Sequence, residues 1–305
     1  KIDQNTFLLE PVSAENLVNN RNSRNFWCNV KGIGSWSLTG NAAEALSKKF
    51  TEMQDDSEVT AGFMWQKTTR ESKKYQLRGE ILSFIPVEKN VEVMLVTITN
   101  TGRMAQTVTP TAAIPLYGRS ADNIRDHRHV TSLLHRIETT DIGVLVTPTL
   151  SFDERGHQVN HMTYYCVGWS GNGEKPVDFY PTAEDFVGEG GNFERPYAIV
   201  KNAEGVKAGT RIEGLEAVGG LHFSEVTLEP EEECSYLIFT GITEDIQEIR
   251  NLSKTYTTRE MVLEELEKTK AYWQEKVNVA YHTGDSDFNQ FMHWVSFQPI
   301  LRRIY

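Results

Sequence analysis

The densest group of side chains able to do chemistry lies between residues 117 and 129. The segment reads Tyr117-Gly118-Arg119-Ser120-Ala121-Asp122-Asn123-Ile124-Arg125-Asp126-His127-Arg128-His129 and stands between strand-like runs, so we expect a loop. Its arginine, aspartate and imidazole groups offer charge-assisted hydrogen bonds to sugar hydroxyls or to phosphate. A surface Arg–Asp network without a binding role is the alternative, and spacing alone does not separate the two.

Other motifs give weaker indications. His127 and His129 are two residues apart, the spacing at which side chains share one face of a strand. No Cys or carboxylate follows at a zinc-like spacing, so we expect no metal site. No G-x-S-x-G nucleophile motif occurs. Gly32-Ile33-Gly34-Ser35 resembles the start of a phosphate loop, but no Lys-Ser/Thr pair follows. A β-turn leading into Trp36 is therefore expected there.

Large aromatic residues could stack on sugar rings. Because most large aromatics at strand positions belong to the core, we expect a core position for each of them. They are Phe26, Trp27, Trp36, Trp65, Trp169, Tyr180 and Phe186.

The elements that must position these groups are mostly strands. From about residue 26 to 242, glycine, proline and polar turns separate short runs rich in Val, Ile, Thr, Tyr and Phe, which predicts an all-β sandwich or barrel. The run 91–99 is apolar on both faces, as expected for a strand inside a sandwich. The turn 229–232 predicts a hairpin between the runs 221–228 and 234–240.

The pattern becomes helical near residue 255. Thr257 and Glu260 have capping-box spacing, and apolar residues follow at helical intervals. A second helix is predicted after residues 283–287, where Asp285 or Asp287 could cap it. It carries six large apolar residues in ten positions, so we expect a partner layer beyond residue 305 and take the chain to be a fragment.

Composition excludes some classes of function. The 305 residues include 42 acidic and 31 basic ones, a net charge of −11, which disfavours nucleic acid as a partner. No apolar run approaches the roughly 20 residues of a membrane helix, so no membrane contact is expected. Cys28, Cys166 and Cys234 are odd in number and far apart, which favours buried thiols in a reducing cytoplasm.

Several stretches, in order and at consistent spacing, together carry a resemblance to a known family. They are Gly34-Ser35-Trp36-Ser37, the strand pair 75–101, the segment 117–128, Asp185-Phe186-Val187-Gly188 with Arg195-Pro196, Leu228-Glu229-Pro230-Glu231, and Trp294 with Gln298. The chain resembles the N-terminal part of glycoside hydrolase family 94, the cellobiose-phosphorylase-like enzymes once grouped as glycosyltransferase family 36.

The resemblance implies a mainly β fold. A large antiparallel β-sandwich of the galactose-mutarotase-like supersandwich type is expected over residues 1–253. A helical linker would follow over 254–282, and the first helix of an (α/α)6 catalytic barrel over 283–305.

The resemblance also implies an activity. Such enzymes cleave β-linked gluco-oligosaccharides with inorganic phosphate and invert the anomeric centre, giving α-glucose 1-phosphate. The general acid, an Asp, is expected beyond Tyr305, so this chain should hold no catalytic residue. Phosphate is a co-substrate, and no metal or organic cofactor is expected. The expected assembly is a homodimer.

The substrate-side residues follow from the same resemblance. In the family, the loop matching 117–128 ends in a Gln-Arg pair on the sugar-acceptor side. Here Arg falls on Arg128, His127 replaces Gln, the loop's acid falls on Asp122, and Arg125 is a further candidate. The segment 126–136 is closer to the 1,2-β-oligoglucan phosphorylase branch than to cellobiose enzymes.

Two alternatives stay open. One is a non-catalytic carbohydrate-binding module that uses the aromatics as stacking platforms. The other is part of a cyclic β-1,2-glucan synthase-like enzyme, which carries a similar sandwich and barrel.

Overall fold

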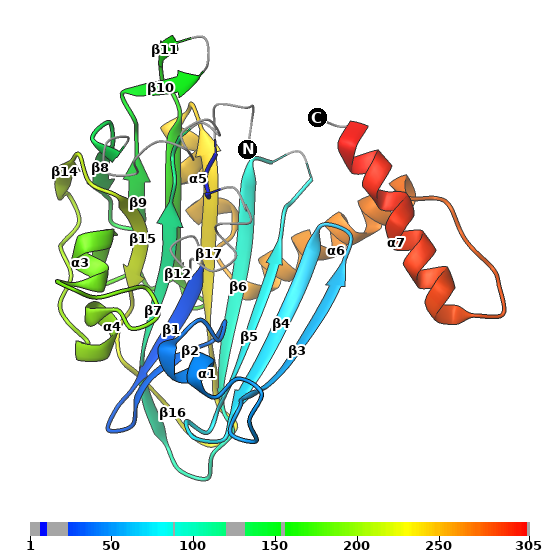
Figure 1. The fold of residues 1–305 in the computed structure, drawn as a ribbon, viewed down its shortest axis with the longest axis horizontal. Coiled ribbons are helices and arrows are strands. Elements are labelled where there is room, and N and C mark those ends of the chain that lie inside the picture. The colour runs from blue at the N-terminus through cyan, green and yellow to red at the C-terminus, as the bar shows by residue number, and fades with distance from the viewer. Residues whose placement is uncertain (1–6, 11–23, 88, 120–131, 154–155, 304–305) are drawn as a thin grey trace.

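Two antiparallel sheets face each other in the computed structural model, which describes residues 7–10, 24–87, 89–119, 132–153 and 156–303 (Figure 1). The smaller sheet has six strands. Their order is β13 (Asp178–Thr182), β15 (Ala217–His222), β7 (Gln106–Leu116), β1 (Asn25–Val30) and β2 (Gly34–Ser37), with β16 (Val226–Leu228) also paired to β7.

The larger sheet has nine strands. Their order is β14 (Arg211–Glu213), β8 (Arg136–Thr139), β9 (Gly143–Val146), β12 (Thr163–Ser170), β17 (Glu233–Thr243), β6 (Val91–Asn100), β5 (Leu77–Phe84), β4 (Trp65–Ser72) and β3 (Asp56–Gly62). A separate hairpin joins β10 (Leu150–Asp153) and β11 (Gly156–Val159). The predicted mainly β, antiparallel supersandwich is confirmed.

The main core fills the space between the sheets. Strand β6 shows how the sequence specifies it: Val96 and Ile98 point into the inter-sheet core, whereas Val93 and Leu95 point to the opposite face. Alternate residues of a strand lie on opposite faces, so a run that is apolar throughout must be covered on both. The interpretation of run 91–99 as an internal strand is confirmed.

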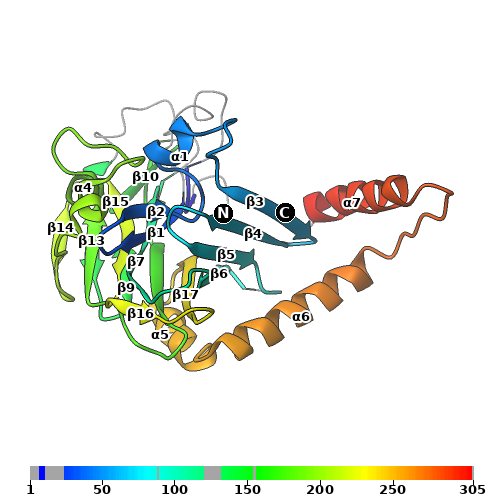
Figure 2. The same cartoon turned by 90° about the horizontal axis from the view of Figure 1, so that it is seen from below.

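Helices cover the outer faces of both sheets. Figure 2 shows α6 (Arg259–Lys276) running along the larger sheet after α5 (Ile246–Thr255), and Ile249, Val262 and Leu266 pack there. The short helices α1 (Ala43–Ser47), α3 (Ala183–Val187) and α4 (Tyr197–Lys201) lie on the smaller sheet. Among the aromatics assigned to the core, all are buried except Trp65, which is half-buried.

The last helix, α7 (Ser286–Arg303), lies beside the β3–β4 turn (Figure 2). Asp285 Oδ1 accepts hydrogen bonds from the backbone N–H groups of Asp287 and Phe288, so Asp285 is the cap among the two acids proposed. Phe297 packs with Trp273 of α6, but Phe288 and Phe291 are 47% and 61% exposed. The domain boundaries at 253 and 282 stay predictions.

Two local predictions are wrong. The runs 221–228 and 234–240 form no hairpin, because β16 pairs with β7 in the smaller sheet while β17 pairs with β6 and β12 in the larger one. Alternation gives the faces of a strand but not its partner. Helix α6 is capped by Thr258, whose hydroxyl accepts from Met261 N–H, and not by Thr257.

Candidate functional site

The predicted substrate-side residues lie outside the described part of the chain. The structure does describe both flanks of their loop, Tyr117–Arg119 before it and Ser132–His135 after it. These flanks follow β7 and precede β8, at one end of the sandwich. The predicted substrate-side residues that lie outside the described ranges are Asp122, Arg125, His127 and Arg128.

The flank before the loop, Tyr117–Arg119 (the incoming flank), is hydrogen-bonded to a short N-terminal segment, residues 7–10. The Phe7 N–H donates to the Arg119 carbonyl at 2.9 Å, and the Tyr117 N–H donates to the Leu8 carbonyl at 2.8 Å. The Arg119 guanidinium carbon lies 4.9 Å from the centre of the Tyr117 ring, a cation–π distance. Arg119 is 5% exposed, so this cation is part of the packed base of the loop.

His135 anchors the flank after the loop, Ser132–His135 (the outgoing flank). Its ring Nδ1 lies 3.2 Å from the Leu215 carbonyl, and its backbone N–H donates to Ser132. A Cβ added to Gly118 would stand 3.4 Å from His135 Nε2, so the two flanks pack directly on each other. Burial, followed by the charge of Arg119, lowers the pKa of His135 to about 3. The imidazole is therefore neutral and supports the loop base instead of supplying charge.

A cavity of about 230 Å³ opens beside the incoming flank. Leu8 and Leu9 form one wall, and the turn from Lys89 to Glu92 forms another. The Glu92 carboxylate forms an ion pair with Arg24. The Asn90 amide and backbone carbonyls can hydrogen-bond a hydroxylated molecule, which suits binding. None of the described residues around it pairs a nucleophile with a base.

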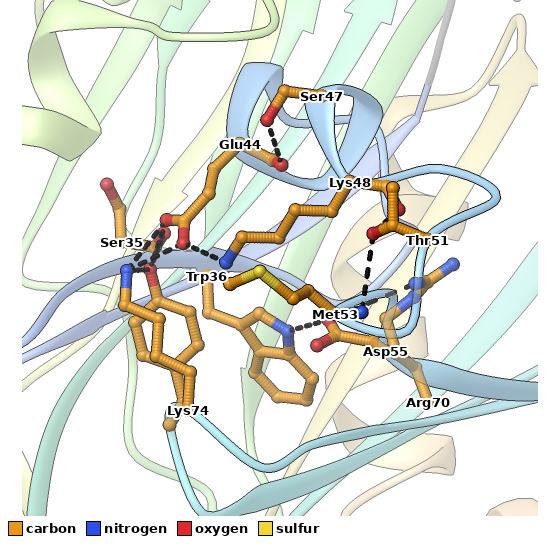
Figure 3. A network of polar contacts seen from close by, with 11 residues as sticks. Ser35, Trp36, Glu44, Ser47, Lys48, Thr51, Met53, Asp55, Arg70 and Lys74 are labelled. Carbon is orange, nitrogen blue, oxygen red and sulfur yellow. Dashed lines mark hydrogen bonds and ion pairs between the residues drawn. The ribbon is translucent and has the colours of Figure 1, made fainter.

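The strongest charged network elsewhere centres on Glu44 of α1 (Figure 3). Its carboxylate accepts hydrogen bonds from Lys48 at 2.6 Å, from Lys74 at 2.7 Å and from the Tyr75 hydroxyl at 2.8 Å. Burial acts to raise the pKa of Glu44, but these hydrogen bonds outweigh it and hold the pKa at about 2. The network joins α1 to the β4–β5 connection.

Beside it, the Trp36 indole N–H donates to Asp55 at 2.9 Å, and Arg70 lies 3.9 Å from the same carboxylate. Burial lowers the pKa of Arg70, opposed by the charge of Asp55. The cavity between these side chains measures about 20 Å³, room for only one or two water molecules. Since Trp36 is 3% exposed, its ring cannot stack on a sugar, and the cluster fastens the fold.

A buried acid–base pair lies on the outer face of the smaller sheet. His222 Nδ1 and Asp178 Oδ1 are 2.6 Å apart, and the two residues are direct cross-strand neighbours on β15 and β13. Lys207 approaches the second oxygen of Asp178 at 3.8 Å. Sequence reasoning missed this pair because 44 residues separate the partners and no local motif marks either one.

The described residues form neither a metal site nor a membrane-spanning helix. No group of three or more His, Cys, Asp or Glu side chains there is arranged to hold a metal ion, although His127 and His129 fall outside that part. No helix in the same part of the chain has the length and apolar character needed to cross a membrane.

Three solved structures are similar to the chain at low sequence identity. A bacterial glucoamylase complexed with acarbose has 9% identity and a TM-score of 0.46, with 82% of this chain and 31% of that chain covered. A polysaccharide lyase has 12% identity and a TM-score of 0.35, with 75% and 26% covered. A TPR-domain containing protein from Parabacteroides distasonis has 10% identity and a TM-score of 0.28, with 63% and 35% covered. The chain thus spans only about a third or less of each of these proteins.

No curated protein sequence matches the chain. The family model described as "Glycosyl hydrolase 94, supersandwich domain" matches residues 13–259. This range takes in both sheets of the sandwich, the loop flanks and α5. Because the match extends over far more than half of the 305 residues, the chain belongs to glycosyl hydrolase family 94 and carries its supersandwich domain.

Proposed function

We propose that the chain is the N-terminal part of an inverting glycoside phosphorylase. The whole protein would cleave β-linked gluco-oligosaccharides with inorganic phosphate and release α-glucose 1-phosphate, with β-1,2-linked substrates favoured. The observation that carries the proposal is the family match over residues 13–259, which includes the loop with Arg128. As an enzyme without a metal or organic cofactor, it would act in the cytoplasm as a homodimer.

The reaction assigns separate tasks to the sandwich and to the rest of the protein. A phosphate oxygen attacks the anomeric carbon from the face opposite the leaving sugar, while a carboxylic acid protonates the leaving oxygen. We place that acid outside this chain. The sandwich would contribute binding, in keeping with the described loop flanks, where Arg119 is packed against Tyr117 and His135 is neutral.

The loop would contact the acceptor sugar. Arg128 and Arg125 can donate paired hydrogen bonds to neighbouring hydroxyls, and Asp122 can accept from one. His127 replaces the Gln of cellobiose-type members and can donate from one ring nitrogen and accept at the other. The close packing of Gly118 against His135 supports this role, because a binding loop gains affinity when its ends are held in place before the ligand arrives.

The test is an assay of the full-length protein with phosphate and β-1,2-, β-1,3- or β-1,4-linked glucose disaccharides and trisaccharides. Release of α-glucose 1-phosphate, fastest with β-1,2 linkages, is the expected result. Arg128→Ala should raise the KM for the acceptor in the synthetic direction by about tenfold or more, the effect of losing one charged hydrogen bond. Arg103→Ala is the matched control, since Arg103 is exposed in the turn before β7.

Three results would each contradict a different part of the proposal. No sugar phosphate from any substrate would exclude phosphorolysis and favour the synthase-like or binding-module alternatives. β-Glucose 1-phosphate as the product would exclude inversion. Release of α-glucose 1-phosphate with another linkage preferred would keep the reaction and reject the β-1,2 assignment.

A further inference from the structure

A second cavity, of about 280 Å³, lies on the other side of the turn from Lys89 to Val91. The first cavity adjoins Leu8 and Leu9, which pack against the core between the sheets. The second is lined instead by Tyr165 and Tyr256, which belong to the apolar layer between the larger sheet and its covering helices. It therefore opens on the outer face of the larger sheet, beside α5, which contributes Glu248, Asn251 and Leu252 to its lining.

Tyr165 reaches this cavity because its cross-strand partner is a glycine. Tyr165 on β12 stands directly opposite Gly241 on β17. A Cβ on Gly241 would lie 2.3 Å from the Tyr165 hydroxyl oxygen, so no other residue would let the phenol lie across the strand. Tyr165 is 3% exposed, and among the described residues its hydroxyl has no hydrogen-bond partner. Because Tyr165 lines the cavity, a water molecule or a ligand hydroxyl can pair with its hydroxyl there.

Glu248 supplies the complementary group. One carboxylate oxygen, Oε2, accepts from the Thr243 hydroxyl at 2.5 Å, and Oε1 has no hydrogen bond to any described residue. Burial and then the charge of Glu248 raise the pKa of Tyr165, so the phenol stays protonated as a donor. A donor and an acceptor thus line one cavity. A ligand hydroxyl satisfies both, because it accepts one hydrogen bond and donates another.

Among the described residues, the rest of the lining offers no free cation to an anionic ligand. Lys89 is the only cation among the described lining residues, and it already donates to the Tyr256 hydroxyl at 2.5 Å and to Glu265 at 3.4 Å. The exposed Asn251 adds an amide, which is a neutral donor and acceptor. The tyrosine rings form the apolar part of the wall. The cavity volume lies just below the range of about 300–1,000 Å³ that is typical of pockets for drug-sized molecules.

We propose that this cavity binds one ring of a neutral polyhydroxylated molecule, a sugar, through Tyr165 and Glu248. The site shares no lining residue with the described flanks of the 117–129 loop and does not depend on phosphorolysis. A ring hydroxyl accepts from the Tyr165 phenol and donates to Glu248 Oε1, while Asn251 contacts a neighbouring hydroxyl.

The experiment follows Tyr165 itself. The full-length protein is labelled with 3-fluorotyrosine, and the Tyr165 resonance in the ¹⁹F spectrum is assigned as the one absent in Tyr165→Phe. Glucose, β-linked glucose disaccharides and inositol serve as neutral probes, glucosamine as the cationic probe and α-glucose 1-phosphate as the anionic one. Glu248→Gln and Asn251→Ala test the site at exposed positions, and Glu244→Gln, also exposed and outside the cavity, is the control.

Neutral sugars should shift the Tyr165 resonance in a saturable way, with affinity about tenfold lower in Glu248→Gln and unchanged in Glu244→Gln. A Tyr165 resonance that no neutral probe moves overturns the proposal, and so does a shift with the charged probes alone. Phosphorolysis is measured on the same samples. Its absence leaves the Tyr165 titration interpretable, so failure of this site and failure of the proposed reaction are read separately.

Discussion

The rings of Phe63 and Phe297 stack with their centroids 4.8 Å apart, which joins the β3–β4 turn to α7. His293 meets the same ring edge-on at 4.9 Å, and Trp294 stacks on it at 5.9 Å. One turn residue of the sandwich therefore makes three aromatic contacts with the last helix. The apolar surface of that helix, for which the sequence predicted a partner layer, is covered in part by the sandwich itself.

Phe63→Ala should release α7 from the sandwich. Each aromatic pair contributes about 1 kcal/mol beyond its buried area, and three are lost. Amide hydrogen exchange along residues 286–299 should therefore become faster, with little change in the strands of the larger sheet. Phe50→Ala is the control, because Phe50 is 88% exposed. Unchanged exchange in α7 would mean that other contacts hold the helix.

The Glu44 network should make stability depend on pH in the acid range. The pKa of Glu44 is about 2 in the folded protein and near 4.5 when unfolded, so the unfolded state binds the proton first. The stabilisation is complete above pH 4.5 and is lost as pH falls from there towards 2.

Glu44→Gln should lower stability at neutral pH by about 1 kcal/mol or less, because the carboxylate is more than a third exposed and solvent screens it. The variant and the parent should converge as pH approaches 2, measured by urea unfolding across the range. Glu52→Gln, an exposed acid in the next turn, should show no such convergence. A constant difference at every pH would contradict the assignment.

How far the sequence could predict the structure depends on the distance over which each feature is encoded. The sandwich could be predicted from the alternation of side chains along single strands, and the Asp285 cap from three adjacent positions. The pairing of β16 with β7 could not be predicted in this way, because strand pairing is decided by the whole core. The Glu44–Lys48 contact has helical spacing and was visible in principle, but Lys74 comes from another connection.

The candidate sites divide in the same way. The loop at 117–129 stood out because its polar residues are consecutive in the sequence, and its four proposed substrate-side residues stay predictions. The Tyr165–Glu248 cavity gave no local signal, since its groups come from β12 and α5 and their approach requires Gly241 on a third element. Only the pairing of β12 with β17 brings that glycine under the phenol.

His135 should make stability fall below neutral pH. Its pKa is about 3 folded and near 6.5 unfolded, so the unfolded state takes up the proton first as pH drops. The stabilisation is present above pH 6.5 and declines by up to about 1.4 kcal/mol per pH unit towards pH 3. The part of the pH dependence that comes from His135 is isolated by comparing the unfolding free energy of the parent with that of His135→Asn, because neither protein carries a charge at position 135 above pH 7. Parallel stability curves between pH 6.5 and 4 would show that the imidazole is already charged.

The three thiols should be inert in the native protein. Cys28 and Cys166 are fully buried, and Cys234 is half-buried. Burial raises the pKa of each thiol, to about 11 for Cys234, and only the thiolate reacts quickly. Native protein at pH 8 should therefore react slowly with a disulfide reagent, and Cys234 should react first.

Urea should expose all three thiols together, because Cys28 and Cys166 both lie in the core between the sheets. Peptide mass spectrometry identifies the labelled positions, and Cys234→Ser should remove the first phase of native labelling. Fast labelling of Cys166 in the native state would show that the sandwich opens locally. Its thiol lies between the sheets against the Gly219 carbonyl, and its strand is paired with β17 on one edge and β9 on the other.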